Sequence, residues 1–199
     1  MFFNFHTHKT CENALVSSRE NPGCSCWSLE KHPWFLPEKF IFPDETFYEE
    51  LSAASALGEI GLDRLRGPDL KIQREYLKAF LAAAEHCGKP VVIHAVRCDS
   101  ELDFELSRFS GRVLIHGFCG GNKRLQEHLQ YNRFVSFALG GWKNCPESLR
   151  ASKLRNIGLE TDDTNLNIED IYLQAETETG ISGWENCCAD NFIRFIRGK

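Results

Sequence analysis

Five short apolar runs in this chain each end in a histidine or a carboxylate. The runs read FFNFHTH, ALGEIGLD, VVIHA, VLIHG and NIGLETD. A short apolar run bounded by glycine, proline or polar residues predicts a buried strand. Because the same placement recurs in five strands, we expect the strand ends to converge on one point. The C-terminal ends of the strands meet in this way at the active face of a parallel barrel.

The residues at these strand ends belong to the types that bind metal ions. They are His6, His8, Glu59, His94, His116 and Asp162. Side chains alternate along a strand, so the two histidines of the HTH segment point to the same side and can bind one ion. Taken singly, a buried ion pair explains the glutamate, and a hydrogen-bonded histidine without a metal explains each of the four histidines. The set as a whole favours a metal site.

Strands and helices alternate along the sequence. The patterns predict strands over 2–6, 14–18, 24–29, 54–63, 91–95, 112–117, 134–139 and 156–161, and helices over 43–51, 69–87, 99–109, 121–130, 146–152 and twice within 168–196. The clearest helix is 69–87, whose leucines and Phe80 recur at helical spacing and which Gly88 and Pro90 close. Asp44 is the predicted N-cap of the helix before it.

This alternation predicts an α/β fold, a (β/α) TIM-type barrel that occupies residues 1–199 as a single domain. A typical barrel of this type has about 250 residues, so this one is compact. The shortage lies early, because residues 9–23 leave no room for a full helical crossover. We expect one early βα unit to be abbreviated, with an outer helix missing and the second strand rudimentary or absent.

Composition and charge limit the function classes. The net charge is −5, which disfavours extended binding to duplex DNA. No apolar run reaches the ~18 residues that span a membrane, and the segment MFFNFHTHK lacks the features of a secretory signal. The nine cysteines have no regular spacing and are expected to be reduced thiols. We therefore expect a cytoplasmic protein with no membrane partner.

Four further residues are candidates for substrate contacts. His32 and Trp34 follow a predicted strand, and Arg97 lies three residues after His94. Asp63 ends the ALGEIGLD run. The guanidinium can bind a phosphate through two hydrogen bonds, and the indole can stack on a base. Three of the four have an alternative: a capped turn for the histidine, a surface ion pair for the arginine and a core position for the tryptophan.

The order HxH, HPW, GEIGLD, IHxxR, IHGF and LETD resembles the TatD family of metal-dependent hydrolases, in its short branch. The resemblance covers nearly the whole chain. It implies a (β/α) barrel that holds two divalent metal ions (Mg, Mn or Zn). It also implies deoxyribonuclease activity on phosphodiester bonds, as a 3′-to-5′ exonuclease on single-stranded DNA, with RNA as a further possible nucleic-acid substrate.

The resemblance also implies roles for individual residues. His6 and His8 correspond to ligands of the first metal, His94 and His116 to ligands of the second, and Glu59 to the carboxylate shared between them. Asp162 corresponds to a last-strand ligand that carries protons, so it and the glutamate are the predicted catalytic residues. Two other functions stay open: a metal-dependent amide, lactone or ester hydrolase, and a non-catalytic metal-binding partner protein. The sequence does not indicate an obligate protein partner.

Overall fold

The structure is a computed structural model that describes residues 1–198. Its eight strands form one parallel sheet in chain order. They are β1 (Asn4–Thr7), β2 (Ala14–Ser18), β3 (Trp27–Leu29), β4 (Ala56–Asp63), β5 (Val91–Val96), β6 (Val113–Ile115), β7 (Phe134–Phe137) and β8 (Ile157–Leu159). Chain-order parallel strands joined by helical crossovers define a (β/α) TIM-type barrel fold. The predicted fold class is therefore confirmed.

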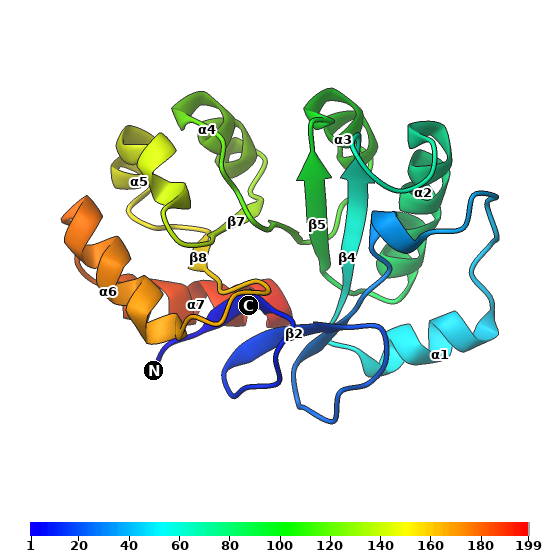
Figure 1. Cartoon of the computed structure of the whole chain (residues 1–199), viewed down its shortest axis with the longest axis horizontal. Coiled ribbons are helices and arrows are strands. Elements are labelled where there is room, and N and C mark those ends of the chain that lie inside the picture. The colour runs from blue at the N-terminus through cyan, green and yellow to red at the C-terminus, as the bar shows by residue number, and fades with distance from the viewer. Residues whose placement is uncertain (199) are drawn as a thin grey trace. The chain divides into compact units, whose positions relative to one another are not determined.

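Helices follow the strands from β3 onward (Figure 1). They are η1 (Pro33–Phe35), α1 (Glu45–Ala53), α2 (Leu70–His86), α3 (Asp99–Leu106), α4 (Asn122–Gln130), η2 (Gly141–Asn144), α5 (Pro146–Ser152), α6 (Ile168–Thr179) and α7 (Trp184–Arg197). None of these described helices combines the length and the apolar character that crossing a membrane requires.

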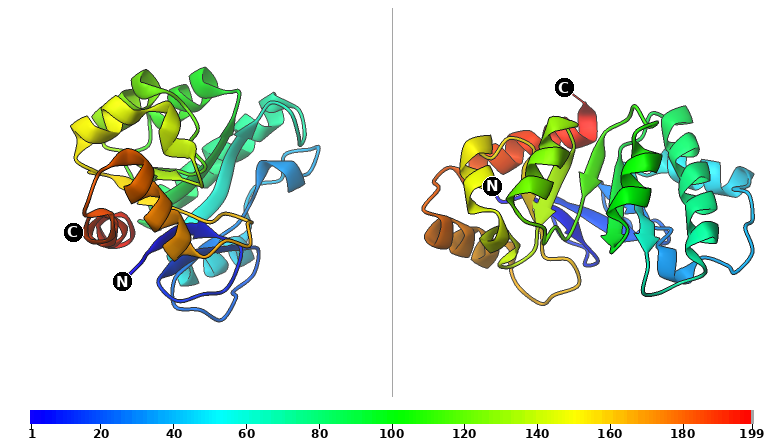
Figure 2. Two further views of the ribbon diagram at one scale, coloured as in Figure 1. Left: turned by 60° about the vertical axis from the view of Figure 1, so that its left-hand side comes forward. Right: turned by 90° about the horizontal axis from the view of Figure 1, so that it is seen from above.

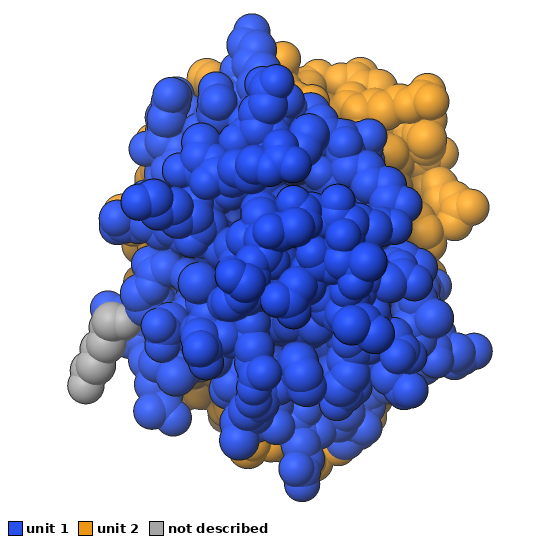
Figure 3. Space-filling view, turned by 90° about the vertical axis from the view of Figure 1, so that its left-hand side faces the viewer, with its two compact units in different colours: residues 1–16, 114–199 blue, residues 17–113 orange. Residues whose placement is uncertain are grey.

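The chain divides into two compact units, which Figure 3 shows in two colours. The first unit comprises residues 1–16 and the chain from residue 114 on, and the second unit comprises residues 17–113. The two boundaries fall inside β2 and β6. The single domain over residues 1–199 stays a prediction, and Lys199 lies outside the described residues.

In the first unit, β8 pairs with β7 and also meets β1. Thr7 bridges Asp162 in parallel, and the Asp162 amide donates to the His6 carbonyl oxygen at 3.1 Å. Phe5 is fully buried over Gly158, where an added Cβ would lie 2.4 Å from the phenyl ring, so only glycine fits there. The helices α4 and α5 lie side by side in this unit, as Figure 2 shows. These contacts fix the ends of β1 and β8 next to each other.

In the second unit, β4 pairs with β3 on one side and β5 on the other. Gly61 lies opposite His94, and a Cβ at this glycine would come 2.0 Å from the His94 carbonyl oxygen. Helix α2 packs on β4 with Leu77 and Phe80 buried. Asp69 caps its first turn by accepting from the Lys71 amide at 2.8 Å. The glycine therefore allows the close approach that places Glu59 and His94 on neighbouring strands.

The early part of the barrel differs from the prediction in one respect. The second strand covers Ala14–Ser18, as the sequence pattern over 14–18 predicted, so the further expectation that it would be rudimentary or absent is wrong. The predicted loss of an outer helix is seen, and within the described residues neither the β1–β2 nor the β2–β3 connection contains a helix. The short run ALVSS is buried over its first four residues, and this burial explains why it forms a strand without a helix to cover it.

Candidate metal-binding clusters

The first cluster lies in the first unit, at the C-terminal ends of β1 and β8. The Nε2 atoms of His6 and His8 lie 3.7 and 3.6 Å from Oδ1 of Asp162. His6 is fully buried, and Asp162 is partly exposed. Ligand atoms of the three residues lie within 4.8 Å of one another. Two imidazoles and one carboxylate at this spacing suit a divalent transition-metal ion such as Zn²⁺.

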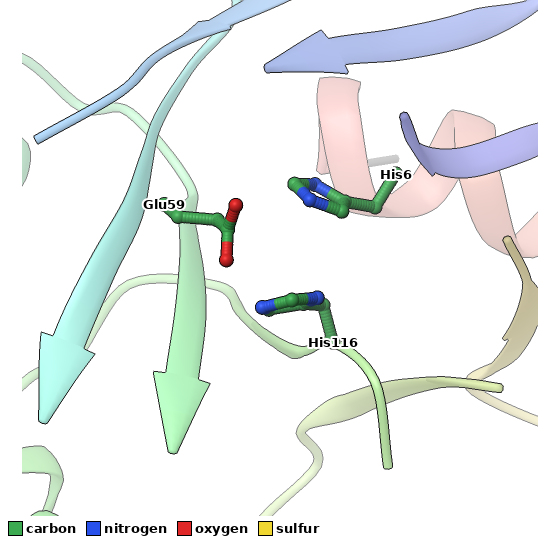
Figure 4. Close-up of side chains that lie close together, drawn as sticks. All are labelled: His6, Glu59 and His116. Atoms are coloured by element: carbon green, nitrogen blue, oxygen red, sulfur yellow. The ribbon is translucent and has the colours of Figure 1, made fainter. Parts of the chain in front are cut away.

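His116 extends this cluster from the end of β6. Its imidazole lies beside that of His6, with the ring centroids 4.4 Å apart (Figure 4). Its Nδ1 atom lies 3.5 Å from Oε1 of Glu160. Ligand atoms of His116, Glu160 and Asp162 also lie within 4.8 Å of one another. The first cluster therefore consists of His6, His8, His116, Glu160 and Asp162.

Glu160 is the member of this cluster that the sequence reasoning missed. It is completely buried and accepts hydrogen bonds from the Gly117 amide at 2.7 Å and from the Ser136 hydroxyl. Burial alone would raise the pKa of this carboxyl, but His116, His6 and Ser136 outweigh it and hold the pKa below its ordinary value. The signal was present, because Glu160 and Asp162 are two residues apart, as His6 and His8 are.

The second cluster lies in the second unit and consists of His32, Glu59 and His94, whose ligand atoms lie within 4.8 Å of one another. Oε1 of Glu59 is 3.5 Å from Nε2 of His32 and 3.3 Å from Nδ1 of His94. The Lys31 amide donates to the Glu59 carbonyl oxygen at 3.0 Å, and this bond aligns the end of β3 with β4. Figure 4 shows the Glu59 carboxylate at the end of its side chain on β4.

The two histidines of the second cluster differ in what they can bind. Nδ1 of His32 accepts a hydrogen bond from the Trp34 amide at 3.1 Å. In a neutral imidazole the proton is then on Nε2, the nitrogen that faces Glu59. That nitrogen donates a hydrogen bond and does not bind a cation. His32 therefore fits the predicted substrate contact better than it fits a metal ligand.

His94 has the opposite arrangement. Its Nε2 atom lies 3.2 Å from Oδ2 of Asp63, so the ring donates its proton to this carboxylate and leaves Nδ1 toward Glu59 as the lone-pair nitrogen. A carboxylate behind a histidine in this way orients a metal ligand and raises its basicity. Asp63 therefore lies behind the second cluster, and a direct contact with substrate stays a prediction.

Asp63 is itself held by four hydrogen-bond donors. Oδ2 accepts from the Trp34 indole as well as from His94, and Oδ1 accepts from the amides of Leu65 and Arg66 at 2.7 and 3.2 Å. Burial would raise the pKa of Asp63, but the bonds from Trp34, Leu65 and His94 outweigh it and lower the pKa. The carboxylate therefore stays charged.

Trp34 and Arg97 occupy exposed positions near the second cluster. The indole is 38% exposed, and the Arg66 guanidinium lies 4.4 Å from its ring centroid. Arg97 follows β5 with an exposed side chain, and its carbonyl oxygen accepts from Nε of Arg64 at 2.8 Å. Stacking by Trp34 and phosphate binding by Arg97 stay predictions.

The predicted ligands are thus distributed over two clusters. His6, His8, His116 and Asp162 lie together in the first unit, and Glu59 and His94 lie together in the second. The convergence of all six on one centre stays a prediction.

Comparison with known proteins assigns the chain to a family of metal-dependent hydrolases. A family model described as "TatD related DNase" matches residues 1–169. An uncharacterized metal-dependent hydrolase of Methanocaldococcus jannaschii is 34% identical over 83 residues, which are 42% of this chain and 32% of that protein. The match therefore spans about a third of the length of this curated relative.

Solved structures show the same fold. A TatD homolog from Escherichia coli K12 superposes with a TM-score of 0.74 at 16% identity, over 98% of this chain and 97% of that one. A TatD family hydrolase from Entamoeba histolytica superposes with a TM-score of 0.61 at 16% identity, over 76% of this chain and 66% of that one.

Proposed function

Because this chain belongs to the TatD related DNase family of metal-dependent hydrolases, we propose that it hydrolyses phosphodiester bonds of nucleic acids, as a 3′-to-5′ exonuclease on single-stranded DNA. The observation that carries the proposal is the pair of clusters in which histidines and carboxylates meet at the C-terminal ends of parallel strands. That end of a barrel is where the active sites of enzymes with this fold are found.

The donor sets fit two divalent ions. The first cluster offers two to three imidazoles with carboxylates, and the second offers Glu59 with one unprotonated nitrogen of His94. Six predicted ligands exceed the three that one four-coordinate catalytic ion uses. Divalent ions bound there would neutralise phosphate charge and make water more acidic. Mg²⁺, Mn²⁺ and Zn²⁺ are all compatible with histidine and carboxylate ligands.

The residues of the chain supply positioning and proton transfer. The carboxylate of Asp162 is partly exposed, lies at the strand end beside two histidines, and so can orient a water molecule and take its proton. The Nε2–H group of His32 lies 3.5 Å from Oε1 of Glu59, and a phosphate oxygen bound at this cluster can share that donor, while the exposed Arg97 can add a bidentate contact. Glu59 lies between His32 and His94 and holds both rings in place.

The charge of the chain favours a strand end over a long duplex. A net charge of −5 disfavours extended binding to double-stranded DNA. A few contacts around the scissile phosphate then provide the binding, and these suit the terminal nucleotides of a single strand. A cytoplasmic location is part of the same proposal.

End-labelled single strands test the proposal directly. Chelated protein is reloaded with Mg²⁺, Mn²⁺ or Zn²⁺ and mixed with DNA labelled at either end. A 3′-to-5′ exonuclease releases the label of a 3′-labelled strand at once as a mononucleotide, whereas a 5′-labelled strand shortens stepwise. Duplex DNA and RNA of the same sequence complete the series. His86→Ala, which alters an exposed histidine on α2, is the control variant.

The negative outcome is equally defined. If the metal-loaded protein releases no nucleotide from any strand but opens a lactone, ester or amide, the nucleic-acid substrate is wrong and the metal-dependent hydrolase is retained. If Asp162→Asn cleaves DNA at the rate of the unaltered protein, the proposed proton transfer is wrong.

A further inference from the structure

A cavity of about 360 Å³ lies beside the second cluster, entirely within the second unit. His32 lines it, and so do Phe35, Tyr76, Phe80, Ile41 and Arg19. His32 therefore belongs both to this cavity and to the cluster with Glu59 and His94.

The cavity is preformed. The segment after η1 forms part of its wall, and the Tyr76 hydroxyl joins this segment to α2. The hydroxyl accepts from the Ile41 amide at 2.9 Å and donates to the Lys39 carbonyl oxygen at 3.0 Å. Both bonds join backbone groups of the segment to one buried side chain. A ligand that enters therefore does not need to order this segment.

The lining combines buried aromatic rings with exposed apolar side chains. Tyr76 and Phe80 are buried at 4% and 5% exposure, whereas Phe35 and Ile41 are exposed at 60% and 62%. The Arg19 guanidinium lies 3.9 Å from the centroid of the Phe35 ring. Exposed aromatic rings and guanidinium planes are the surfaces on which nucleobases stack. This combination next to a polar cluster suits a flat ring better than a flexible chain.

The charges disfavour a second phosphate in the cavity. Nε of Arg19 lies 3.5 Å from Glu30, and Nζ of Lys31 lies 3.4 Å from Glu50. Each cation at the cavity is therefore already matched by a carboxylate. A ligand that adds a negative charge would face these carboxylates, whereas a neutral ring would not.

We propose that this cavity is a nucleobase subsite, which binds the base of the nucleotide whose phosphate lies at the second cluster. The proposal rests on the phosphodiesterase function above and names the group that positions its substrate. The volume lies at the small end of the usual range for ligand pockets, about 300–1,000 Å³, and therefore suits one base.

Binding of dAMP compared with 2-deoxyribose 5-phosphate tests the subsite, because the sugar phosphate has a hydroxyl group in place of the base. Calorimetric titration uses the full chain loaded with Mn²⁺. Phe35→Ala should weaken dAMP binding about five-fold or more, the lower limit for the stacking of one base, and leave the sugar phosphate unchanged. Phe35→Tyr keeps the ring and should restore dAMP binding, which separates stacking from a folding defect.

Phe104→Ala is the matched control. Phe104 is 48% exposed on α3 and has the Arg108 guanidinium 4.6 Å from its ring centroid, but it does not line the cavity. This variant should bind both ligands as the unaltered protein does. Equal loss of dAMP and sugar phosphate in Phe35→Ala, or no loss of either, would overturn the subsite.

Failure of the subsite and failure of the proposed function give different results. Base-dependent binding at Phe35 without any phosphodiester hydrolysis would support the subsite and contradict the proposed exonuclease activity. Release of mononucleotides from single strands, together with equal affinity for dAMP and the sugar phosphate, would contradict the subsite and support the exonuclease activity.

Discussion

Asp63→Asn is the substitution with the sharpest expected effect on the second cluster. The carboxylate accepts from four donors, two on each oxygen: Trp34 and His94 on Oδ2, and the amides of Leu65 and Arg66 on Oδ1. Asparagine has the same shape, but one of its two terminal atoms is an NH₂ group. Whichever way the amide is turned, two donors then face this group and lose their acceptor.

The expected cost follows from these two lost bonds. Hydrogen bonds to a charged group contribute roughly 1.5–3 kcal/mol each, so two at the low end give about 3 kcal/mol of unfolding free energy. The low end applies because the amides of Leu65 and Arg66 can turn toward water, since both residues are exposed. A cluster histidine that loses its outer carboxylate also typically binds its metal ion 10- to 100-fold more weakly.

Urea denaturation at neutral pH, followed by tryptophan fluorescence, measures the stability, and calorimetric titration with Mn²⁺ measures the metal affinity. Asp69→Asn is the control, because Asp69 is exposed, caps α2 through one bond to the Lys71 amide, and asparagine caps helices equally well. If Asp63→Asn unfolds at the same urea concentration as this control and keeps its metal affinity, the four-donor account of Asp63 is wrong.

The same carboxylate predicts a pH dependence. The pKa of Asp63 is lowered in the folded protein, so its contribution to stability is fully present above the unfolded value of about 3.9. The contribution is lost as the pH falls through the lower folded pKa. The Asn variant has no such group, so its unfolding free energy should fall less steeply than that of the unaltered protein between about pH 4 and the folded pKa. Parallel acid curves for the two proteins would contradict this.

Three further substitution experiments and one measurement test the proposed site. The double variant His6→Ala with His8→Ala should lose turnover and keep the circular dichroism spectrum, because the backbone bond from the Asp162 amide to the His6 carbonyl oxygen does not depend on the imidazoles. Asp162→Asn should abolish cleavage of end-labelled DNA, and retained cleavage would remove it from proton transfer. Trp34→Ala should mainly raise the apparent substrate constant in steady-state assays. Elemental analysis of the saturated protein should find two divalent ions per chain, and one ion would contradict the two-cluster proposal.

The arrangement of strands and helices was largely predictable because its signals are local. Helix α2 follows from apolar residues at helical spacing between Asp69 and Gly88, and its observed bounds, Leu70–His86, lie one residue inside the predicted ones. The N-cap at Asp44 is present, with the Phe47 amide donating to its carboxylate at 3.0 Å. The strand Ala14–Ser18 was expected to be rudimentary or absent, but pairing with the adjacent strand stabilises it. Such pairing cannot be read from a local sequence pattern.

The parts of the site that the sequence did not reveal depend on bonds between distant segments. Glu160 joins the first cluster through the Gly117 amide and the Ser136 hydroxyl, which come from the ends of two other strands. The protonation of His32 is set by one backbone amide, that of Trp34, which faces the ring because η1 begins at Pro33. A histidine in sequence is equally able to bind a cation or to donate a hydrogen bond. Only the bond at its other nitrogen decides which, and this is why His94, with Asp63 behind it, fits a metal ligand and His32 fits a phosphate donor.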